Sequence, residues 1–254
     1  MGKIISLLNH KGGVGKTTSA INIGAGLAEL GKKVLLIDLD PQANLTLSLG
    51  VPRQPNSIYE AFRGESELEP YNVKENLDVV ISTLDLSGAE MEMINEAGRE
   101  FILRELFEPI RETYDFIIID CPPSLGLLTL NALTSSDIVY IPLQTEFLAL
   151  QGLAKIKQVI QKVKLRLNKK LVIGGVIATM YDSRKVLNRD VVETIRKYFG
   201  NLVFDTYIRD NVALAEAPSQ RKDIFAYNPQ SSGASDYLDL CKEILVRCEQ
   251  VEVG

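Results

Sequence analysis

The stretch that decides the fold runs from Asn9 to Thr18 and reads N-H-K-G-G-V-G-K-T-T. A short apolar run, Ile4–Leu8, precedes it, and a segment with helical spacing, Thr17–Leu30, follows it. A strand, a glycine-rich loop and a helix in this order form the loop that binds nucleotide phosphates. The sequence therefore predicts a P-loop for a nucleoside triphosphate.

The residue types of this loop each have a physical role. Glycine allows backbone conformations closed to other residues, so Gly12, Gly13 and Gly15 let the main chain approach an anion closely. The loop N–H groups and the positive end of the following helix then face the phosphates. Lys16 would neutralise the phosphate oxygens, and the Thr17 hydroxyl would ligate Mg²⁺.

The strict pattern G-x-x-x-x-G-K-[ST] fails at one position, because His10 stands where the first glycine should be. Lys11 adds a second cation at the head of the glycines. An ordinary glycine turn with two solvated lysines is the alternative interpretation. The order of strand, glycines, Lys-Thr pair and helix favours the phosphate-binding loop.

Acidic residues follow two further apolar runs. Asp38 and Asp40 come after Val34–Ile37, and Asp120 comes after Phe116–Ile119. Ligands of open α/β sheets bind outside the carboxyl ends of the strands, so these carboxylates should lie beside the P-loop. There they could support Mg²⁺ and orient a nucleophilic water. A simple turn at the end of the strand is the alternative for Asp38 and Asp40.

The rest of the chain alternates apolar strands with helical segments, which predicts an α/β fold with a mostly parallel sheet covered by helices on both faces. The further predicted strands are Leu77–Ser82, Ile138–Leu143 and Leu171–Ala178. The further predicted helices are Ile58–Arg63, Ala89–Phe107 with a break near Gly98, Phe147–Leu167, Val186–Tyr198 and, approximately, Ser235–Val246. A length of 254 residues suits one such domain.

Composition narrows the class of protein. No apolar run approaches the roughly 20 residues of a membrane span, and the first strand begins without a preceding signal-peptide pattern. The three cysteines, Cys121, Cys241 and Cys248, lack metal-ligand spacing. This usage is typical of a protein in a reducing cytoplasm.

The net charge of −5 hides an uneven distribution. Between Lys155 and Lys222 the chain has 15 Lys and Arg residues against 6 Asp and Glu residues, a local charge of +9. Such a split indicates a face for a polyanion on an otherwise acidic body. Lysine-rich helix faces that only contact water are the alternative, and charge alone does not decide between them.

Four motifs together resemble one family. They are K-G-G-V-G-K-T-T, V-L-L-I-D-L-D-P-Q, F-I-I-I-D-C-P-P-S-L-G and N-V-A-L-A-E-A-P-S, in this order over nearly the whole chain. They resemble the ParA/Soj branch of the deviant Walker-A, MinD-type ATPases. The resemblance implies a single P-loop NTPase domain over residues 1–254, without the N-terminal helix-turn-helix extension of longer plasmid proteins. It also implies Mg²⁺-dependent ATP hydrolysis, stimulated by a ParB-like centromere-binding partner during chromosome or plasmid segregation.

The resemblance further implies an ATP-dependent cycle and assigns residues to it. An ATP sandwich homodimer would bind non-specific DNA in the cytoplasm, on the nucleoid. Lys11 resembles the lysine that crosses the dimer to the partner's phosphates, and Asp40 resembles the residue that positions the attacking water. The implied catalytic residues are Lys11, Lys16 and Asp40, and the implied metal residues are Thr17, Asp38 and Asp120. The implied ATP-binding residues are Lys11, Gly12, Gly13, Val14, Gly15, Lys16, Thr17, Thr18, Met180, Arg209 and Pro218, the last three lining the purine.

Five basic residues of the positive segment are candidates for DNA contacts. They lie in polar turns or at the start of a helix, where long side chains can reach phosphates. These candidates are Arg184, Lys185, Arg189, Arg221 and Lys222. The alternative is that they only keep these turns solvated. Ala213 stands where relatives often carry arginine, so the position of the DNA face rests on the local charge pattern.

A MinD-like regulator that cycles on membranes is the alternative function. Such a protein needs a basic amphipathic helix at its C-terminus. The tail after Leu245 reads V-R-C-E-Q-V-E-V-G, in which Arg247 is the single basic residue beside Glu249 and Glu252. Anionic lipid would repel this tail, so the sequence favours a DNA track over a membrane.

Overall fold

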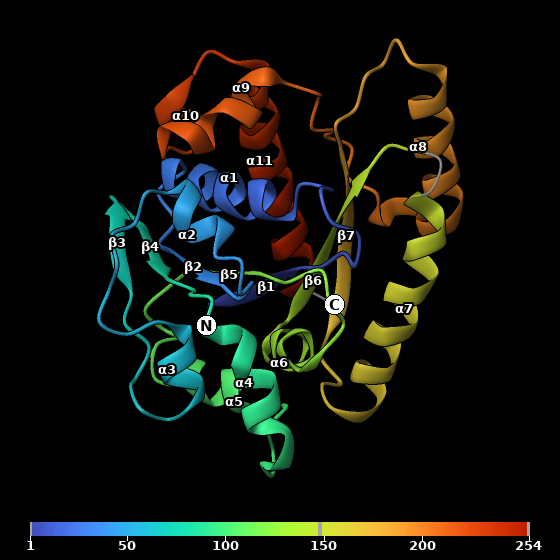
Figure 1. The fold of residues 1–254 in the computed structure, drawn as a ribbon. Helices are drawn as coiled ribbons and strands as arrows, with labels where there is room; N and C mark the ends of the chain where they lie inside the picture. Colours follow the sequence, from blue (N-terminus) through green and yellow to red (C-terminus); the bar gives the residue numbers. More distant parts are fainter. Residues whose placement is uncertain (1, 147–148, 253–254) are drawn as a thin grey trace.

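A twisted sheet of seven strands forms the centre of the computed structural model, which describes residues 2–146 and 149–252 (Figure 1). The strand order is β3-β4-β2-β5-β1-β6-β7, and neighbours pair in parallel except β3 with β4. The strands are β1 Lys3–Leu7, β2 Val34–Asp38, β3 Tyr71–Lys74, β4 Leu77–Val80, β5 Phe116–Asp120, β6 Ile138–Gln144 and β7 Val172–Thr179. The predicted mostly parallel sheet is confirmed.

The central strands explain why their sequences are apolar throughout. Every residue of β2 and β5 is buried, as expected for strands covered on both faces. Their register pairs Asp38 with Asp120, and the register of β1 on β5 pairs Leu7 with the same Asp120. The sheet therefore brings both acids and the start of the P-loop to one edge, the carboxyl ends of three adjacent strands.

Helices cover both faces of the sheet, as predicted. One buried cluster packs α1 and α11 on one face, and a second packs α3 to α8 on the other (Figure 1). The longer helices are α1 Lys16–Glu29, α6 Leu127–Ser135, α7 Ala149–Arg166, α8 Val186–Phe199 and α11 Ser232–Glu252. The shorter ones are α2 Asn44–Ser48, α3 Ile58–Phe62, α4 Leu86–Glu92, α5 Ile102–Phe107, α9 Val212–Glu216 and α10 Ile224–Tyr227, with 3-10 turns η1 Met93–Asn95, η2 Gly200–Leu202 and η3 Ala217–Gln220.

Several predicted elements differ from the structure. Strand β3 lies in a stretch for which no strand was predicted, and it forms an antiparallel hairpin with β4 at the sheet edge. Helix α6, which follows the Asp120 loop, was not predicted. In the expected helix Ala89–Phe107, the predicted break near Gly98 is present, because this glycine adopts a left-handed conformation with φ +73° between η1 and α5. The part before the break differs from the prediction, since it starts earlier, at Leu86, and is itself divided into α4 and η1. Helix α11 starts earlier and ends later than expected, and the predicted start at Phe147 lies outside the described residues.

Two further observations concern the class of protein. Among the described helices, none has a stretch long and apolar enough to cross a membrane. Cys121, Cys241 and Cys248 are buried, and within the described structure they form no disulfide.

Candidate active site

The P-loop joins β1 to α1 at the carboxyl edge of the sheet. Gly13 and Gly15 have φ values of +75° and +86°, a region that other residues enter only with strain. Gly15 immediately precedes α1, so the loop N–H groups and the helix N-terminus face the same space. That arrangement is a binding site for an anion such as phosphate.

Lys16 is a buried cation at the bottom of this loop. The residue is 7% exposed, and its Nζ donates a hydrogen bond to the carbonyl of Lys11 at 3.3 Å. Burial lowers the pKa of Lys16, while Asp120, Cys121 and Asp40 act in the opposite direction. A phosphate oxygen in the loop would supply the counter-charge that the burial of this ammonium otherwise lacks.

The buried carboxylate of Asp120 is the strongest indication of a cation site. Both carboxylate oxygens are buried and accept no hydrogen bond of ordinary geometry from the described residues. The Thr17 hydroxyl is nevertheless near enough to favour the charged carboxylate, which acts to lower its pKa. Burial, and then the nearby Asp38, raise the pKa of Asp120 to about 8. A buried carboxylate without partners is costly, and a divalent cation between it and Thr17 would satisfy it. These residues fit Mg²⁺.

Asp38 differs from Asp120 because its oxygens already have partners. One oxygen accepts hydrogen bonds from the N–H and the hydroxyl of Thr46, at 2.9 and 2.7 Å. The other accepts from the Asp40 N–H at 3.3 Å. Burial raises the pKa of Asp38 to about 6, against the effect of the bonds from Thr46.

Asp40 lies at the same edge, just beyond β2. The residue is 8% exposed, and its carboxylate accepts a hydrogen bond from the Gln42 N–H at 2.9 Å. The structure thus brings Lys16, Thr17 and the three predicted acids together at the P-loop. Among the described residues, no cluster of three or more His, Cys, Asp or Glu side chains could hold a metal ion. Water and phosphate oxygens would therefore supply the remaining ligands of a magnesium ion at this site.

Lys11 lies at the mouth of the loop and is partly exposed. Its Nζ is 3.2 Å from Glu146 Oε2, and its N–H donates to Asn9 Oδ1 at 3.0 Å. The Gln144 side chain donates to the other Glu146 oxygen at 2.7 Å. Glu146 was not among the predicted site residues, although it lies just beyond β6 as Asp40 lies just beyond β2, and the same strand-end rule would have found it.

A pocket of about 230 Å³ adjoins the P-loop. It is lined by Gly15, Thr18, Thr179, Met180, Ile208, Arg209, Asp210, Asn211, Leu214, Ala215 and Tyr237. Thr179 at the end of β7 fixes one wall, because its hydroxyl donates to the carbonyl of Val14 at 2.9 Å. Of the three predicted purine-lining residues, Met180 and Arg209 line this pocket and Pro218 does not. The Arg209 guanidinium is held by Asp236 at 2.6 Å.

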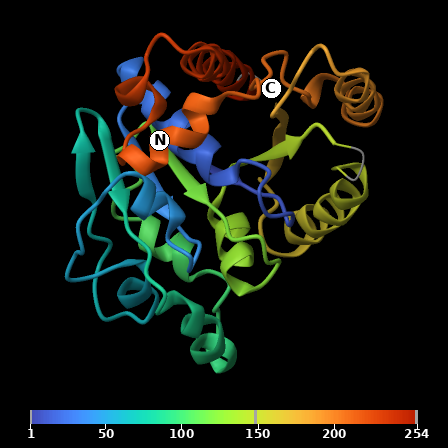
Figure 2. The ribbon, with the colours of Figure 1, turned by 45° about the horizontal axis from the view of Figure 1, so that its top comes forward.

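The five candidates for DNA contacts lie on two turns. Arg184 and Lys185 are exposed between β7 and α8, where Arg184 pairs with Asp182 at 2.9 Å, and Arg189 is exposed in the first turn of α8. Arg221 and Lys222 are exposed between η3 and α10. The two turns lie apart, on either side of α11 (Figures 1 and 2). The structure of one chain therefore does not bring the five residues into one cluster.

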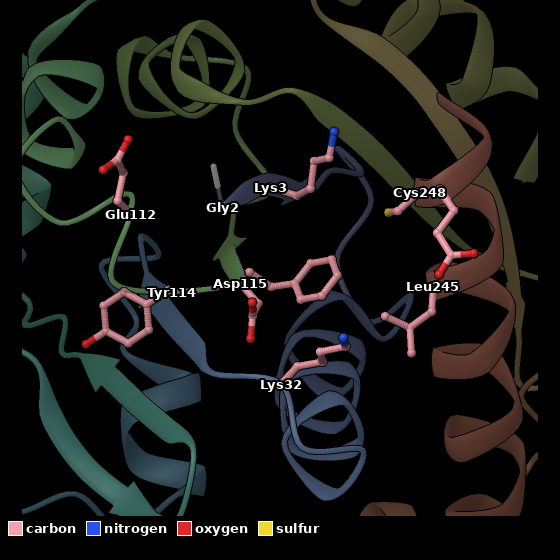
Figure 3. Close-up of a pocket in the computed structure, with 10 residues that line it drawn as sticks. Gly2, Lys3, Lys32, Glu112, Tyr114, Asp115, Leu245 and Cys248 are labelled. Atoms are coloured by element: carbon pink, nitrogen blue, oxygen red, sulfur yellow. The ribbon is translucent and has the colours of Figure 1, made fainter. Parts of the chain in front are cut away.

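A second pocket, of about 260 Å³, lies at the other end of the strands. Its lining includes Lys3 from β1 and Lys32 from the turn before β2, together with Glu112, Asp115 and Glu249 (Figure 3). None of the residues predicted for the site lines it. Basic and acidic side chains are mixed there, so its charge does not select an anion.

Comparison with known proteins agrees with this geometry. The family model for the AAA domain matches residues 2–173. The chain is 47% identical over 249 residues to the sporulation initiation inhibitor protein Soj of Bacillus subtilis (strain 168), covering 96% of this chain and 98% of that protein. It is 46% identical over 254 residues to the chromosome partitioning protein ParA of Myxococcus xanthus (strain DK1622), covering 97% and 89%.

Solved structures show the same fold. Cobyrinic acid a,c-diamide synthase from Mycobacterium smegmatis, in crystals with bound ADP and magnesium or with a bound ATP analogue and magnesium, superposes with a TM-score of 0.87. The sequences are 35% identical, and the match covers 98% of this chain and 96% of that one. The motifs, the geometry of the loop and the full-length relatives agree. The chain therefore belongs to the ParA/Soj family of deviant Walker-A partitioning ATPases.

Proposed function

We propose that this protein binds ATP with Mg²⁺, hydrolyses the ATP, and uses the cycle to segregate chromosomes or plasmids. The observation that carries the proposal is the pairing of the glycine loop with Lys16 and with the unpartnered carboxylate of Asp120. A buried cation and a buried anion placed side by side fit a phosphate chain and its metal ion. The relatives with partitioning names support the biological role.

The residues of the site divide the work of phosphoryl transfer. The loop N–H groups and Lys16 bind the phosphates, and Thr17 and Asp120 hold the cation. Mg²⁺ would neutralise charge on the phosphate oxygens when it is bound. Asp40 orients the attacking water, because its carboxylate lies at the same edge of the sheet and is fixed by the Gln42 N–H. Met180 and Arg209 belong to the wall against which the purine would lie.

Dimerisation would complete the site. Lys11 is at the mouth of the P-loop with a side chain that is 39% exposed, so it can reach a second copy of the chain. In the ATP-bound sandwich dimer, Lys11 contacts the phosphates held by the partner. Full turnover then depends on dimer formation, since each phosphate chain needs a cation from the other copy.

DNA and a ParB-like protein are the proposed partners. The local charge of +9 between Lys155 and Lys222 supports a DNA-binding face, and the dimer would bring two such faces together. A single copy would bind DNA weakly and the dimer more strongly. Because the dimer forms only with ATP, attachment to the nucleoid would depend on ATP. A ParB-like partner bound to the cargo would accelerate hydrolysis and so release the DNA.

The experiment compares wild type with Asp40→Ala. Three properties are measured with ATP and Mg²⁺. They are the mass of the protein by light scattering after size exclusion, the rate of phosphate release, and binding of the protein to non-specific duplex DNA. We expect wild type to turn over, and Asp40→Ala to remain a DNA-bound dimer with negligible turnover. ATP hydrolysis without DNA binding would contradict the partitioning role but leave the ATPase assignment. Binding to anionic vesicles in place of DNA would support the MinD-like alternative.

A further inference from the structure

Thr46 is a buried residue of α2 that uses its hydroxyl twice. The hydroxyl donates to Asp38 Oδ2 at 2.7 Å and accepts a hydrogen bond from the Ser82 N–H at 3.1 Å. The Thr46 N–H also donates to Asp38 Oδ2, at 2.9 Å. One side chain therefore links the end of β2, the helix α2 and the segment that follows β4.

The linked segment contains Asp40. It begins at Asp38, whose second oxygen accepts from the Asp40 N–H, and it ends at Thr46. Inside it, the Ala43 N–H donates to the Asp40 carbonyl at 2.8 Å, and the Leu39 N–H donates to the Asp120 carbonyl at 3.0 Å. Residues 38–46 thus form a loop that is closed at its base by the contact between Thr46 and Asp38. The carboxylate of Asp40 is in this loop and accepts a hydrogen bond from the Gln42 N–H within it.

We propose that Thr46 is a positioning residue for hydrolysis, which acts by closing the loop that carries Asp40. The inference rests on the proposed function, in which Asp40 orients the attacking water. Asp38 then serves as the anchor of this loop. This role uses the oxygens that already accept bonds from Thr46 and Asp40, and leaves the cation to Thr17 and Asp120.

The chemistry requires a hydroxyl at position 46. Valine has nearly the same shape as threonine, but it neither donates to Asp38 nor accepts from Ser82. Thr46→Val would leave the buried Ser82 N–H without an acceptor and would remove one of the two donors to Asp38 Oδ2. The loop is then free to shift, and a shift of about 1 Å in a catalytic group can cost about a hundredfold in rate.

Three variants test the role of the hydroxyl, in the full-length protein with ATP and Mg²⁺. Thr46→Val should lower kcat by about ten- to a hundredfold, with the affinity for a fluorescent ATP analogue changed less than about twofold. Thr46→Ser keeps the hydroxyl and should restore kcat to within about threefold of wild type. Ser48→Ala is the matched control, because Ser48 is in the same helix and makes no side-chain hydrogen bond within the described structure; its kcat should not change.

A second measurement separates positioning from general damage to the fold. If Thr46 acts through Asp40, Thr46→Val should cause no further loss of single-turnover rate in an Asp40→Ala background. Three outcomes would overturn the inference. They are a further loss of single-turnover rate in the Asp40→Ala background as large as in wild type, failure of Thr46→Ser to restore kcat, and a loss of ATP affinity in Thr46→Val that matches its loss of kcat. Thr46→Val with wild-type turnover would overturn it while leaving the proposed function intact. Wild type without any ATP turnover would overturn both.

Discussion

The ammonium of Lys11 lies 3.2 Å from the carboxylate of Glu146, so the lysine at the mouth of the P-loop is paired within its own chain. Both side chains are partly exposed, 39% for Lys11 and 52% for Glu146, and pairs of this kind are worth about 0–1 kcal/mol. An interaction this weak can be exchanged when a stronger anion is offered. The phosphates in a second copy would be such an anion.

The first prediction concerns this exchange. Glu146→Gln should strengthen ATP-dependent dimerisation by up to about fivefold, because Lys11 no longer has to leave a carboxylate to reach the partner's phosphates. Sedimentation equilibrium with Asp40→Ala as the background would measure the dissociation constant of the dimer without turnover. Weaker dimerisation in Glu146→Gln would mean that Glu146 itself contributes to the dimer.

The two loop lysines should have separable effects. Lys16→Ala should abolish ATP binding, because it removes the buried ammonium at the bottom of the phosphate loop. Lys11→Ala should leave ATP binding by the single chain nearly intact and prevent the sandwich dimer. Titration with a fluorescent ATP analogue and light scattering measure the two properties. An equal loss of ATP affinity in both variants would contradict the assignment of Lys11 to the partner's phosphates.

DNA binding should depend on the basic turns in proportion to the phosphates they contact. Each lost contact reduces the slope of log affinity against log salt by about 0.9. Arg189→Ala, and the double variant Arg221→Ala/Lys222→Ala, should both bind non-specific duplex more weakly and with shallower slopes, and dimerise normally with ATP. Lys169→Ala/Lys170→Ala is the control, because these exposed lysines belong to the same positive segment but lie at the amino end of β7, whereas the turn with Arg184 follows its carboxyl end. Unchanged slopes in the test variants would place the DNA face elsewhere.

Packing of α1 against α11 gives a stability prediction. A Cβ on Gly26 would lie 2.7 Å from Cys241 Sγ and 3.1 Å from the Phe225 ring. Overpacking of this kind costs about 1–3 kcal/mol, more than the roughly 1 kcal/mol that alanine gains over glycine in a helix. Gly26→Ala should therefore lower the free energy of unfolding in urea.

Gly88→Ala is the matched control for this packing effect. A Cβ on Gly88, in helix α4, would meet only the flexible Glu92 carboxylate, at 3.6 Å. Its free energy of unfolding should rise by up to about 1 kcal/mol. A rise in both variants would show that α11 can move away from α1 at little cost.

The site residues that could be predicted from the sequence are those at the end of a buried strand. Asp38 and Asp120 end wholly apolar runs, and the rule that ligands bind at the carboxyl ends of strands places them at the P-loop without knowledge of the sheet order. Leu7, Asp38 and Asp120 are indeed neighbours in register. Glu146 obeys the same rule and was missed because β6 was expected to end at Leu143, before the polar residues Gln144 to Glu146.

Other features depend on contacts that no local pattern records. Thr46 bonds to Ser82, 36 residues away, and α2 around it is too short to show helical periodicity. The edge strand β3 has polar and exposed positions, because it borders the sheet on one side only. The wall of the pocket beside the P-loop is formed where the end of β7 and the segment from Ile208 come together, and Pro218, which the resemblance implied for the purine, is not among the residues that line this pocket.

The position of β1 in the sheet has a consequence for how the chain is made. This first strand pairs only with β5 and β6 among the described strands, and those partners begin at Phe116 and Ile138. While the chain is being synthesised, β1 must therefore wait for more than a hundred residues with both edges unpaired. Unpaired edges invite pairing with other chains, and contacts so distant in sequence form slowly. The strand that leads into the P-loop is thus in need of protection on the ribosome.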